Sequence, residues 1–424
     1  MTLKLSTLSQ EFDNKKLGFW EAIRNLPKGV CAVSLFGFFL GISTTMVYSQ
    51  LGLFLKNEIG LSTAEITLLD GIVECIAFVV RVFSGPISDF LGERKTILYV
   101  GCLFTLVGRS LIATASSWLT VVFIQSAERL GNGIQATPRD ALIADLSPQE
   151  FRGRSFGFTR SAKTLGSLLG NVIAVLLMYL LYENYRMVFF CSTVPVIIAI
   201  FCLSKIKTPN KIKGIGNENR KMENPFKKKY LKSLDSTFWK IIALALIFEM
   251  GHFCEHAFSL YANTFASATM SSTVSSFVSL GQVLMSFTIG FLADKYGKRK
   301  LIAVCMACMI IANVSFISAK YIGSYPLINI YIGSFLWGGQ MTAVQGLFLS
   351  LISEVVDYRL RATAMGIYFL MLGVAYFSAS TIAGRIWDTF GVSYTFLYSA
   401  GFSLIALCLL RVLAPKSVAS INNE

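Results

Sequence analysis

The sequence predicts an all-α membrane protein in which about twelve transmembrane helices form two repeated six-helix bundles. Three observations predict this fold class. Hydrophobic residues make up 54% of the chain and charged residues only 15%. Apolar runs of about twenty residues follow one another from end to end, and the second half repeats motifs of the first. A soluble protein of this length would carry many more charged residues on its surface, so soluble classes are excluded.

The apolar runs give the predicted spans, and the polar segments between them give the domain boundaries. Each run is long enough to cross a bilayer as a helix. The predicted spans are 30–55, 66–88, 97–115, 118–138, 155–181, 187–204, 239–262, 272–293, 301–319, 326–351, 362–384 and 392–413. The predicted domains are a cytoplasmic amphipathic tail (1–29), an N-terminal six-helix bundle (30–204), a basic cytoplasmic linker (205–238), a C-terminal six-helix bundle (239–413) and a cytoplasmic tail (414–424).

The net charge of +14 is distributed unevenly between the segments that separate the spans. If the N-terminus is cytoplasmic, the cytoplasmic segments carry 27 Lys and Arg residues and the opposite segments carry four. Cytoplasmic loops of membrane proteins carry such an excess, so both termini are predicted to be cytoplasmic. The lipid bilayer is therefore the expected partner, and nucleic acid is not. All nine cysteines fall within predicted spans and are interpreted as packing residues.

The two halves of the chain repeat a glycine-rich motif. "GPISDFLGERK" begins at Gly85 and "GFLADKYGKRK" begins at Gly290, and farther on Asp145 recurs as Glu354. The repeated pattern, G-x-x-x-D-x-x-G-x-[RK]-[RK], resembles the signature of the major facilitator superfamily. Its residues in the two copies are Gly85, Asp89, Gly92 and Arg94, and Gly290, Asp294, Gly297 and Arg299. The resemblance covers nearly the whole chain and implies the major facilitator fold, with glycines in a sharp turn and charged residues that latch the cytoplasmic side.

Span five departs from a pattern that many exporters of this family carry. The glycine-rich stretch keeps Gly166 and Gly170, but Asn171 stands where those exporters have proline. The two glycines still permit close helix packing. The missing proline weakens an assignment as an antiporter, so the direction of transport stays open.

Ionisable residues within the predicted spans cost about 2.5–3.5 kcal/mol each at a helix centre, so each needs a partner or a function. Asp70 and Glu74 share one face of span two. Span three carries Arg109, and span four carries Arg129, whose position the family resemblance links to proton coupling or substrate contact. Glu128 points about 100° away from Arg129 and is expected to pair with another helix. For the others, a structural ion pair and a role in transport both stay open.

Both histidines of the chain lie in one stretch of span seven, "FEMGHFCEHAF". His252 and His256 form an H-x-x-E-H pattern, as in inverted zinc-protease motifs, but no third ligand follows at the spacing of such enzymes. On one continuous helix, Glu249, His252 and His256 would share a face, with Glu255 one residue off it. Histidine changes charge near physiological pH, so this face suits proton coupling or substrate contact. A structural polar cluster and metal coordination are the alternatives, and no metal site is predicted.

Lys163 lies about 13 Å into span five, too deep to reach the cytoplasm easily. It stands where related bacterial sequences carry an acid. If it faces the cavity near Arg129 and Arg109, the solute would be an anion, such as a carboxylate metabolite or siderophore. The alternative is a structural ion pair with Glu128 or Glu74.

These features together favour a secondary active transporter that works by alternating access, and they do not indicate an enzyme. No Walker motif is present, so the proton gradient is the expected energy source and no cofactor is expected. The expected partner is a small-molecule substrate, and the chain is expected to act as a monomer in a bacterial inner membrane. A multidrug-type exporter and a non-transporting receptor on the same scaffold are the alternatives.

Overall fold

The computed structural model describes residues 27–91, 94–147, 152–206, 234–321, 325–356 and 360–413, and the regular secondary structure of these residues is helical. The first half comprises α3 (Lys28–Asn57), α4 (Thr63–Leu91), α5 (Arg94–Ile112), α6 (Trp118–Leu146), α7 (Arg152–Leu180), α8 (Tyr185–Cys191) and α9 (Thr193–Ser204). The second half comprises α11 (Ser236–Glu249), α12 (His256–Ala262), α13 (Ala268–Ser272), α14 (Val274–Tyr296), α15 (Lys298–Tyr321), α16 (Pro326–Val355), α17 (Arg361–Phe390) and α18 (Val392–Leu413).

Eight helices of the described residues, with α8 and α9 taken as one, are long and apolar enough to cross a membrane. They are α3, α5, α7, α8–α9, α15, α16, α17 and α18. Helices α4 and α6 are also long, but they carry several ionisable residues each, among them Glu74 and Arg129. The all-α membrane fold is confirmed, whereas the number of twelve spans and the cytoplasmic location of both termini stay predictions.

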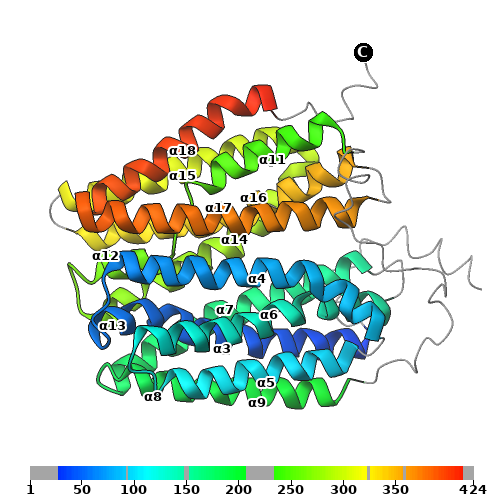
Figure 1. Cartoon of the computed structure of the whole chain (residues 1–424), viewed down its shortest axis with the longest axis horizontal. Coiled ribbons are helices and arrows are strands. Elements are labelled where there is room, and N and C mark those ends of the chain that lie inside the picture. The colour runs from blue at the N-terminus through cyan, green and yellow to red at the C-terminus, as the bar shows by residue number, and fades with distance from the viewer. Residues whose placement is uncertain are drawn as a thin grey trace, which may run out of the picture.

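Figure 1 shows the chain folded into two helical halves. Helices α3 and α5 to α9 lie together in one half, and α11 and α15 to α18 lie in the other, with α4 and α17 side by side along the boundary. The helices of each half fall within the two predicted bundles. The domain boundaries stay predictions, and residues 207–233 of the predicted linker lie outside the described residues.

Each half has its own hydrophobic core. The largest cluster of buried apolar side chains runs from Leu234 to Leu410 and belongs entirely to the second half. Its centre is aromatic: the Phe258 and Phe316 rings stack with centroids 4.7 Å apart, and the Phe316 and Phe396 rings with centroids 4.6 Å apart. Aromatic pairs of this kind add stability beyond their buried area. The second half is therefore a well-packed body in its own right.

Glycines allow α3 and α7 to approach closely in the first half. A Cβ on Gly166 would lie 2.2 Å from the Phe38 carbonyl oxygen, and a Cβ on Gly170 would lie 2.4 Å from that of Ile42. A real Cβ cannot approach a backbone oxygen so closely, and a backbone cannot move aside as a flexible side chain can. The two backbones therefore touch at the glycines that the sequence marks for helix packing.

The two halves meet at the end of the molecule where α4 begins and α17 ends, which we call the outer end. There the Ala64 N–H donates a hydrogen bond to Asp388 Oδ2 at 2.9 Å, and the Thr269 hydroxyl donates one to Glu183 Oε1 at 2.8 Å. Leu260 of α12 and Ala268 of α13 also join the buried apolar cluster of the first half. The predicted orientation places this closed end on the outer side of the membrane.

The glycine contact gives a testable prediction. We expect Gly170→Ala to destabilise the protein by about 1–3 kcal/mol, because the added methyl group forces α3 away from α7. Thermal unfolding of the purified protein in detergent measures this loss. Gly401→Ala is the matched control, since a Cβ there meets no atom within 4 Å. Equal melting temperatures for the two variants would contradict the close approach.

Candidate functional site

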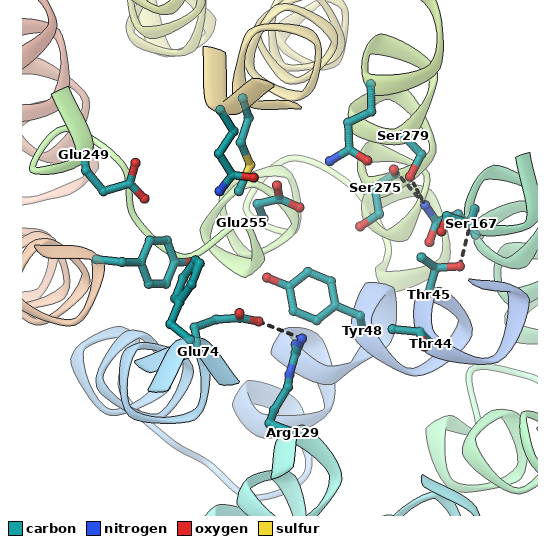
Figure 2. Close-up of a pocket in the computed structure, with 16 residues that line it drawn as sticks. Thr44, Thr45, Tyr48, Glu74, Arg129, Ser167, Glu249, Glu255, Ser275 and Ser279 are labelled. Atoms are coloured by element: carbon teal, nitrogen blue, oxygen red, sulfur yellow. Dashed lines mark hydrogen bonds and ion pairs between the residues drawn. The ribbon is translucent and has the colours of Figure 1, made fainter. Parts of the chain in front are cut away.

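A cavity of about 220 Å³ lies between the two halves (Figure 2). Both halves contribute to its lining, and fourteen of the sixteen lining residues carry a polar group on the side chain. The lining residues are Thr44, Thr45, Tyr48, Glu74, Phe78, Arg129, Ser167 and Asn171 of the first half, and Glu249, Glu255, Ser275, Ser279, Gln282, Met341, Gln345 and Tyr376 of the second. Three of the lining residues carry a carboxylate and one carries a guanidinium. Most of the others carry a hydroxyl or an amide group.

Arg129 and Glu74 form the charged centre of the cavity. The Arg129 guanidinium lies 2.7 Å from Glu74 Oε1, an ion pair that joins α6 to α4 (Figure 2). The same guanidinium lies 5.4 Å from the centre of the Tyr48 ring on α3, a cation–π contact. Because each partly buried charge has a partner, the pair avoids the large cost of an uncompensated charge in a membrane protein.

Asp70 lies one helical turn before Glu74, in a different environment. It is 3% exposed and does not line the cavity. The Tyr376 hydroxyl of α17 donates a hydrogen bond to Asp70 Oδ2 at 2.8 Å, and His256 Nε2 lies 3.8 Å from Asp70 Oδ1. The two acids that share one face of α4 thus have separate surroundings: Glu74 faces the cavity, and Asp70 joins the two halves.

Span seven is broken, so the prediction of one continuous face carrying Glu249, His252 and His256 is wrong. Helix α11 ends at Glu249 and α12 begins at His256. Gly251 lies in the break, where a Cβ would come within 3.0 Å of the Ser399 carbonyl oxygen of α18. Glycine has the lowest helix propensity apart from proline, and here its missing side chain also gives the chain room to pass α18.

The break sends the four polar side chains of this stretch in different directions. His252 turns into the core of the second half, where Gln340 Nε2 lies 3.0 Å from its Nε2 atom and the Phe248 carbonyl oxygen lies 3.3 Å from its Nδ1 atom. His256 turns towards the first half, and its ring packs on Tyr48. Glu255, expected to lie off the functional face, lines the cavity together with Glu249.

Two of the predicted cations lie away from the cavity lining. Arg109 is 1% exposed and pairs with Glu128 at 2.7 Å, which joins α5 to α6 and confirms that Glu128 pairs with another helix. Lys163 is exposed on α7 and is absent from the residues that line the cavity. Among the described residues it forms no ion pair with Glu128 or Glu74, since these carboxylates pair with Arg109 and Arg129. The structural partners predicted for Lys163 are therefore wrong.

The signature motif is described only in part. Gly85 lies in α4 and Gly290 in α14, whereas Gly92 lies outside the described residues, as do the side chains of Asp89 and Asp294. Gly297 has φ +85°, a left-handed conformation that favours glycine, in the turn between α14 and α15. Arg299 donates a hydrogen bond from Nη2 to the Arg411 carbonyl oxygen at 2.8 Å.

Asp145 and Glu354 pair with basic residues of the motif, although neither was predicted as a site residue. Arg94 pairs with Asp145, and Lys298 pairs with Glu354. Each pair joins the start of one helix to the end of the next within a single half. Asp145 and Glu354 are equivalent positions of the internal repeat, so the repeat itself was the sequence signal for both contacts.

The polar lining was also missed, although it had a sequence signal. Ser167 and Asn171 are four residues apart on α7, as are Ser275 and Ser279 on α14. This spacing places each pair on one helix face. Asn171 Nδ2 donates hydrogen bonds to the Ser275 carbonyl oxygen at 2.9 Å and to Ser279 Oγ at 2.8 Å, so the two faces meet across the halves.

Comparisons with known proteins agree with this architecture. The model of the Major Facilitator Superfamily matches residues 33–265 and 256–424. An uncharacterized MFS-type transporter of Methanocaldococcus jannaschii is 25% identical over 397 residues, which cover 91% of this chain and 95% of the relative.

Two solved structures share the fold at low identity. The nucleoside transporter NupG superposes with a TM-score of 0.74 at 13% identity and covers 91% of this chain and 99% of its own. A D-xylose-proton symporter superposes with a TM-score of 0.73 at 15% identity and covers 91% of this chain and 97% of its own. These findings confirm the resemblance carried by the two motif copies, and the chain belongs to the Major Facilitator Superfamily of membrane transporters.

Proposed function

We propose that this transporter moves a small, neutral, hydroxyl-rich solute, of the sugar, polyol or nucleoside class, by alternating access and uses the proton gradient. The observation that carries the proposal is the lining of the central cavity. Hydroxyl and amide groups reach it from both halves, among them Thr44, Ser167, Asn171, Ser275 and Gln345. Such groups can donate and accept hydrogen bonds, which is what the many hydroxyls of a sugar or nucleoside require.

The charges of the cavity favour a neutral solute over the anion considered from the sequence. An anion was expected because Lys163, Arg109 and Arg129 were expected near the cavity. Only Arg129 lines it, and Glu74 already neutralises this charge. Glu249 and Glu255 add two further carboxylates to the same lining. An anionic solute would meet like charges there, which disfavours its binding.

The size of the cavity favours a small metabolite over a multidrug-type substrate. Its volume of about 220 Å³ lies below the range of about 300–1,000 Å³ that is usual for pockets holding drug-sized molecules. The two solved structures of the same fold are a nucleoside transporter and a D-xylose-proton symporter, which agrees with this size class.

Glu249 is the residue we assign to proton coupling. It lines the cavity from the end of α11, and the His252 Nδ1 atom lies 3.6 Å from its Oε2 atom. A carboxylate in a membrane-embedded cavity is costly when ionised, and binding a proton removes its charge. The proton motive force supplies about 2.3 kcal/mol per charge per 100 mV, enough to drive solute accumulation.

We also propose that the protein resides as a monomer in the inner membrane of a bacterium. The strongly basic segments predicted on the cytoplasmic side support insertion into the cell membrane. The two halves of one chain line the central cavity between them, which supports a single chain as the unit of transport.

Solute counterflow in proteoliposomes tests the proposed substrate class whatever the orientation of the protein. We expect preloaded D-xylose, myo-inositol or uridine to drive uptake of its labelled form, because only neutral hydroxylated solutes match the lining. Citrate and a quaternary ammonium dye serve as anionic and cationic comparisons. Counterflow of citrate or of the dye, without any for the neutral solutes, would overturn the proposal.

Removing one cavity hydroxyl should weaken solute binding by about the free energy of one hydrogen bond. We expect Thr44→Val to raise KM by about 2–10-fold, the equivalent of about 0.5–1.5 kcal/mol, with little change in maximal rate. Initial rates of uptake measure both parameters. Thr114→Val, at an exposed position outside the cavity, is the control, and a similar KM in both variants would remove Thr44 from the site.

Neutralising Glu249 should uncouple transport from the proton gradient. We expect Glu249→Gln to abolish accumulation driven by an imposed pH gradient but to retain counterflow, because counterflow needs no net proton movement. The two assays on the same proteoliposomes measure this difference. Glu58→Gln, which removes a carboxylate paired with Arg186 outside the cavity, should leave both activities intact. Accumulation by Glu249→Gln at the wild-type level would assign coupling elsewhere.

A further inference from the structure

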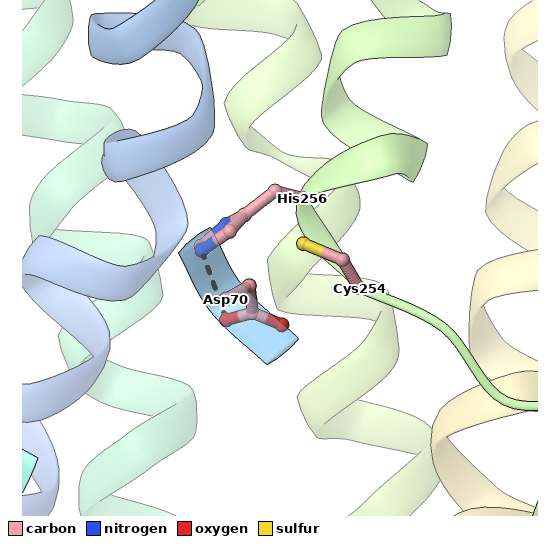
Figure 3. A group of neighbouring side chains, drawn as sticks. All are labelled: Asp70, Cys254 and His256. Atoms are coloured by element: carbon pink, nitrogen blue, oxygen red, sulfur yellow. Dashed lines mark ion pairs between the residues drawn. The ribbon is translucent and has the colours of Figure 1, made fainter. Parts of the chain in front are cut away.

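Three side chains that commonly bind metal ions meet at the boundary of the two halves (Figure 3). Asp70 comes from α4 of the first half, Cys254 from the break between α11 and α12, and His256 from the start of α12. One ligand atom from each residue lies within 4.8 Å of the others. All three are buried: Asp70 is 3% exposed, Cys254 is fully buried, and His256 is 4% exposed.

His256 points at Asp70 without forming a hydrogen bond to it. The distance of 3.8 Å between His256 Nε2 and Asp70 Oδ1 is too long for a hydrogen bond, and this buried nitrogen has no other hydrogen-bond partner. An unsatisfied buried polar group costs about 1–3 kcal/mol. The ring is nevertheless held in place. Tyr48 packs on it with centroids 4.3 Å apart, and the backbone of Gly52 lies close to the Cβ of His256, since a Cβ added to Gly52 would come within 2.6 Å of it.

The spacing of these atoms matches the spacing of ligands around one tetrahedral ion. With metal–ligand distances of about 2.0–2.3 Å, two ligands of tetrahedral zinc lie about 3.3–3.8 Å apart. For a nitrogen and an oxygen ligand the expected separation is about 3.3–3.5 Å, so the Nε2–Oδ1 distance of 3.8 Å is only a few tenths of an ångström too long. The remaining ligand atoms, which lie within 4.8 Å, need side-chain adjustments of about 1 Å or less.

The chemistry of the set selects a transition-metal ion rather than a hard cation. Imidazole and thiolate ligands favour Zn²⁺ and related ions, whereas Mg²⁺ and Ca²⁺ prefer oxygen ligands. The Cys254 sulfur lies within 4.8 Å of both the Asp70 carboxylate and the His256 ring nitrogen, so all three ligand atoms surround the same point. Tyr376 holds the other oxygen, Oδ2, of Asp70, as outer groups that orient metal ligands do.

We propose that Asp70, Cys254 and His256 bind one Zn²⁺-class ion that bridges the two halves and locks the outer end closed. Because the ligands come from both halves, the ion can keep all three only while α4 and α12 stay together. An ion that binds one conformation better shifts the population towards it. Binding therefore stabilises the conformation closed at the outer end and slows the alternating movement. The ion site does not depend on which solute the cavity carries.

Cobalt binding to the purified wild-type protein in detergent tests the site directly. We expect one Co²⁺ per chain, with the visible bands of a tetrahedral ion and a near-ultraviolet charge-transfer band from a thiolate ligand. Zn²⁺ should displace Co²⁺ and remove both signals. Absence of binding, or binding without the thiolate band, would overturn the proposal on the wild-type protein alone, whether or not any variant folds.

Variants identify the ligands. Cys254→Ser should lose the thiolate band, and His256→Gln should weaken Co²⁺ binding by at least about tenfold. The chain offers matched controls in its other buried histidine and a buried cysteine of α15. His252→Gln and Cys305→Ser should bind Co²⁺ as the wild type does, since neither residue belongs to the cluster. Equal loss in the control variants would overturn the ligand assignment.

Transport measurements test the lock. We expect micromolar-range Zn²⁺ titration to inhibit wild-type counterflow reversibly, with activity restored by a chelator, and Cys254→Ser to need at least about tenfold more Zn²⁺ for the same fractional inhibition. Each variant is compared with its own rate in chelator, so a lower basal rate does not affect the result. Co²⁺ bound at the cluster with no effect of Zn²⁺ on counterflow would overturn the lock.

Discussion

The cost of an ionised side chain inside a membrane governs the arrangement of the first half. Two of its deeply placed cations meet this cost with a carboxylate on a neighbouring helix: Arg109 pairs with Glu128, and Arg129 pairs with Glu74, both at 2.7 Å. The two pairs tie α6 to α5 on one side and to α4 on the other. Breaking such a pair leaves an uncompensated charge, so these contacts fix the first half as one rigid unit that can carry the cavity wall.

The sequence was sufficient for the helical fold and for part of this pairing. Apolar length predicts a spanning helix, and the 100° step per residue predicts that Glu128 leaves the face of Arg129. The choice of partner was beyond the sequence, because it depends on which helices are neighbours in space. Lys163 shows this: the carboxylates expected to pair with it are held by Arg109 and Arg129, which approach from other helices.

The break in span seven could not be predicted from hydropathy. The stretch from α11 to α12 lies within one long apolar run, and Gly251 was its main local sign of a weak helix. A continuous helix would have placed His252 in the cavity and Glu255 outside it. The break reverses their roles, since the direction of each side chain now depends on loop geometry and on contact with α18. It also turns Cys254 and His256 towards Asp70, a grouping that no sequence spacing reveals.

The contacts within each half and the contacts between the halves differ in kind, and this difference makes alternating access physically feasible. Within the second half, stacked rings such as Phe258 and Phe316 bury apolar surface that cannot separate without a large loss of free energy. At the outer end, the halves meet through hydrogen bonds such as those from Ala64 to Asp388 and from Thr269 to Glu183, together with apolar contacts of Leu260 and Ala268. Water can replace a hydrogen bond at little net cost. The halves can therefore part at the outer end while the aromatic core of the second half stays intact, and an ion held by three ligands there would oppose this separation more strongly than the hydrogen bonds do.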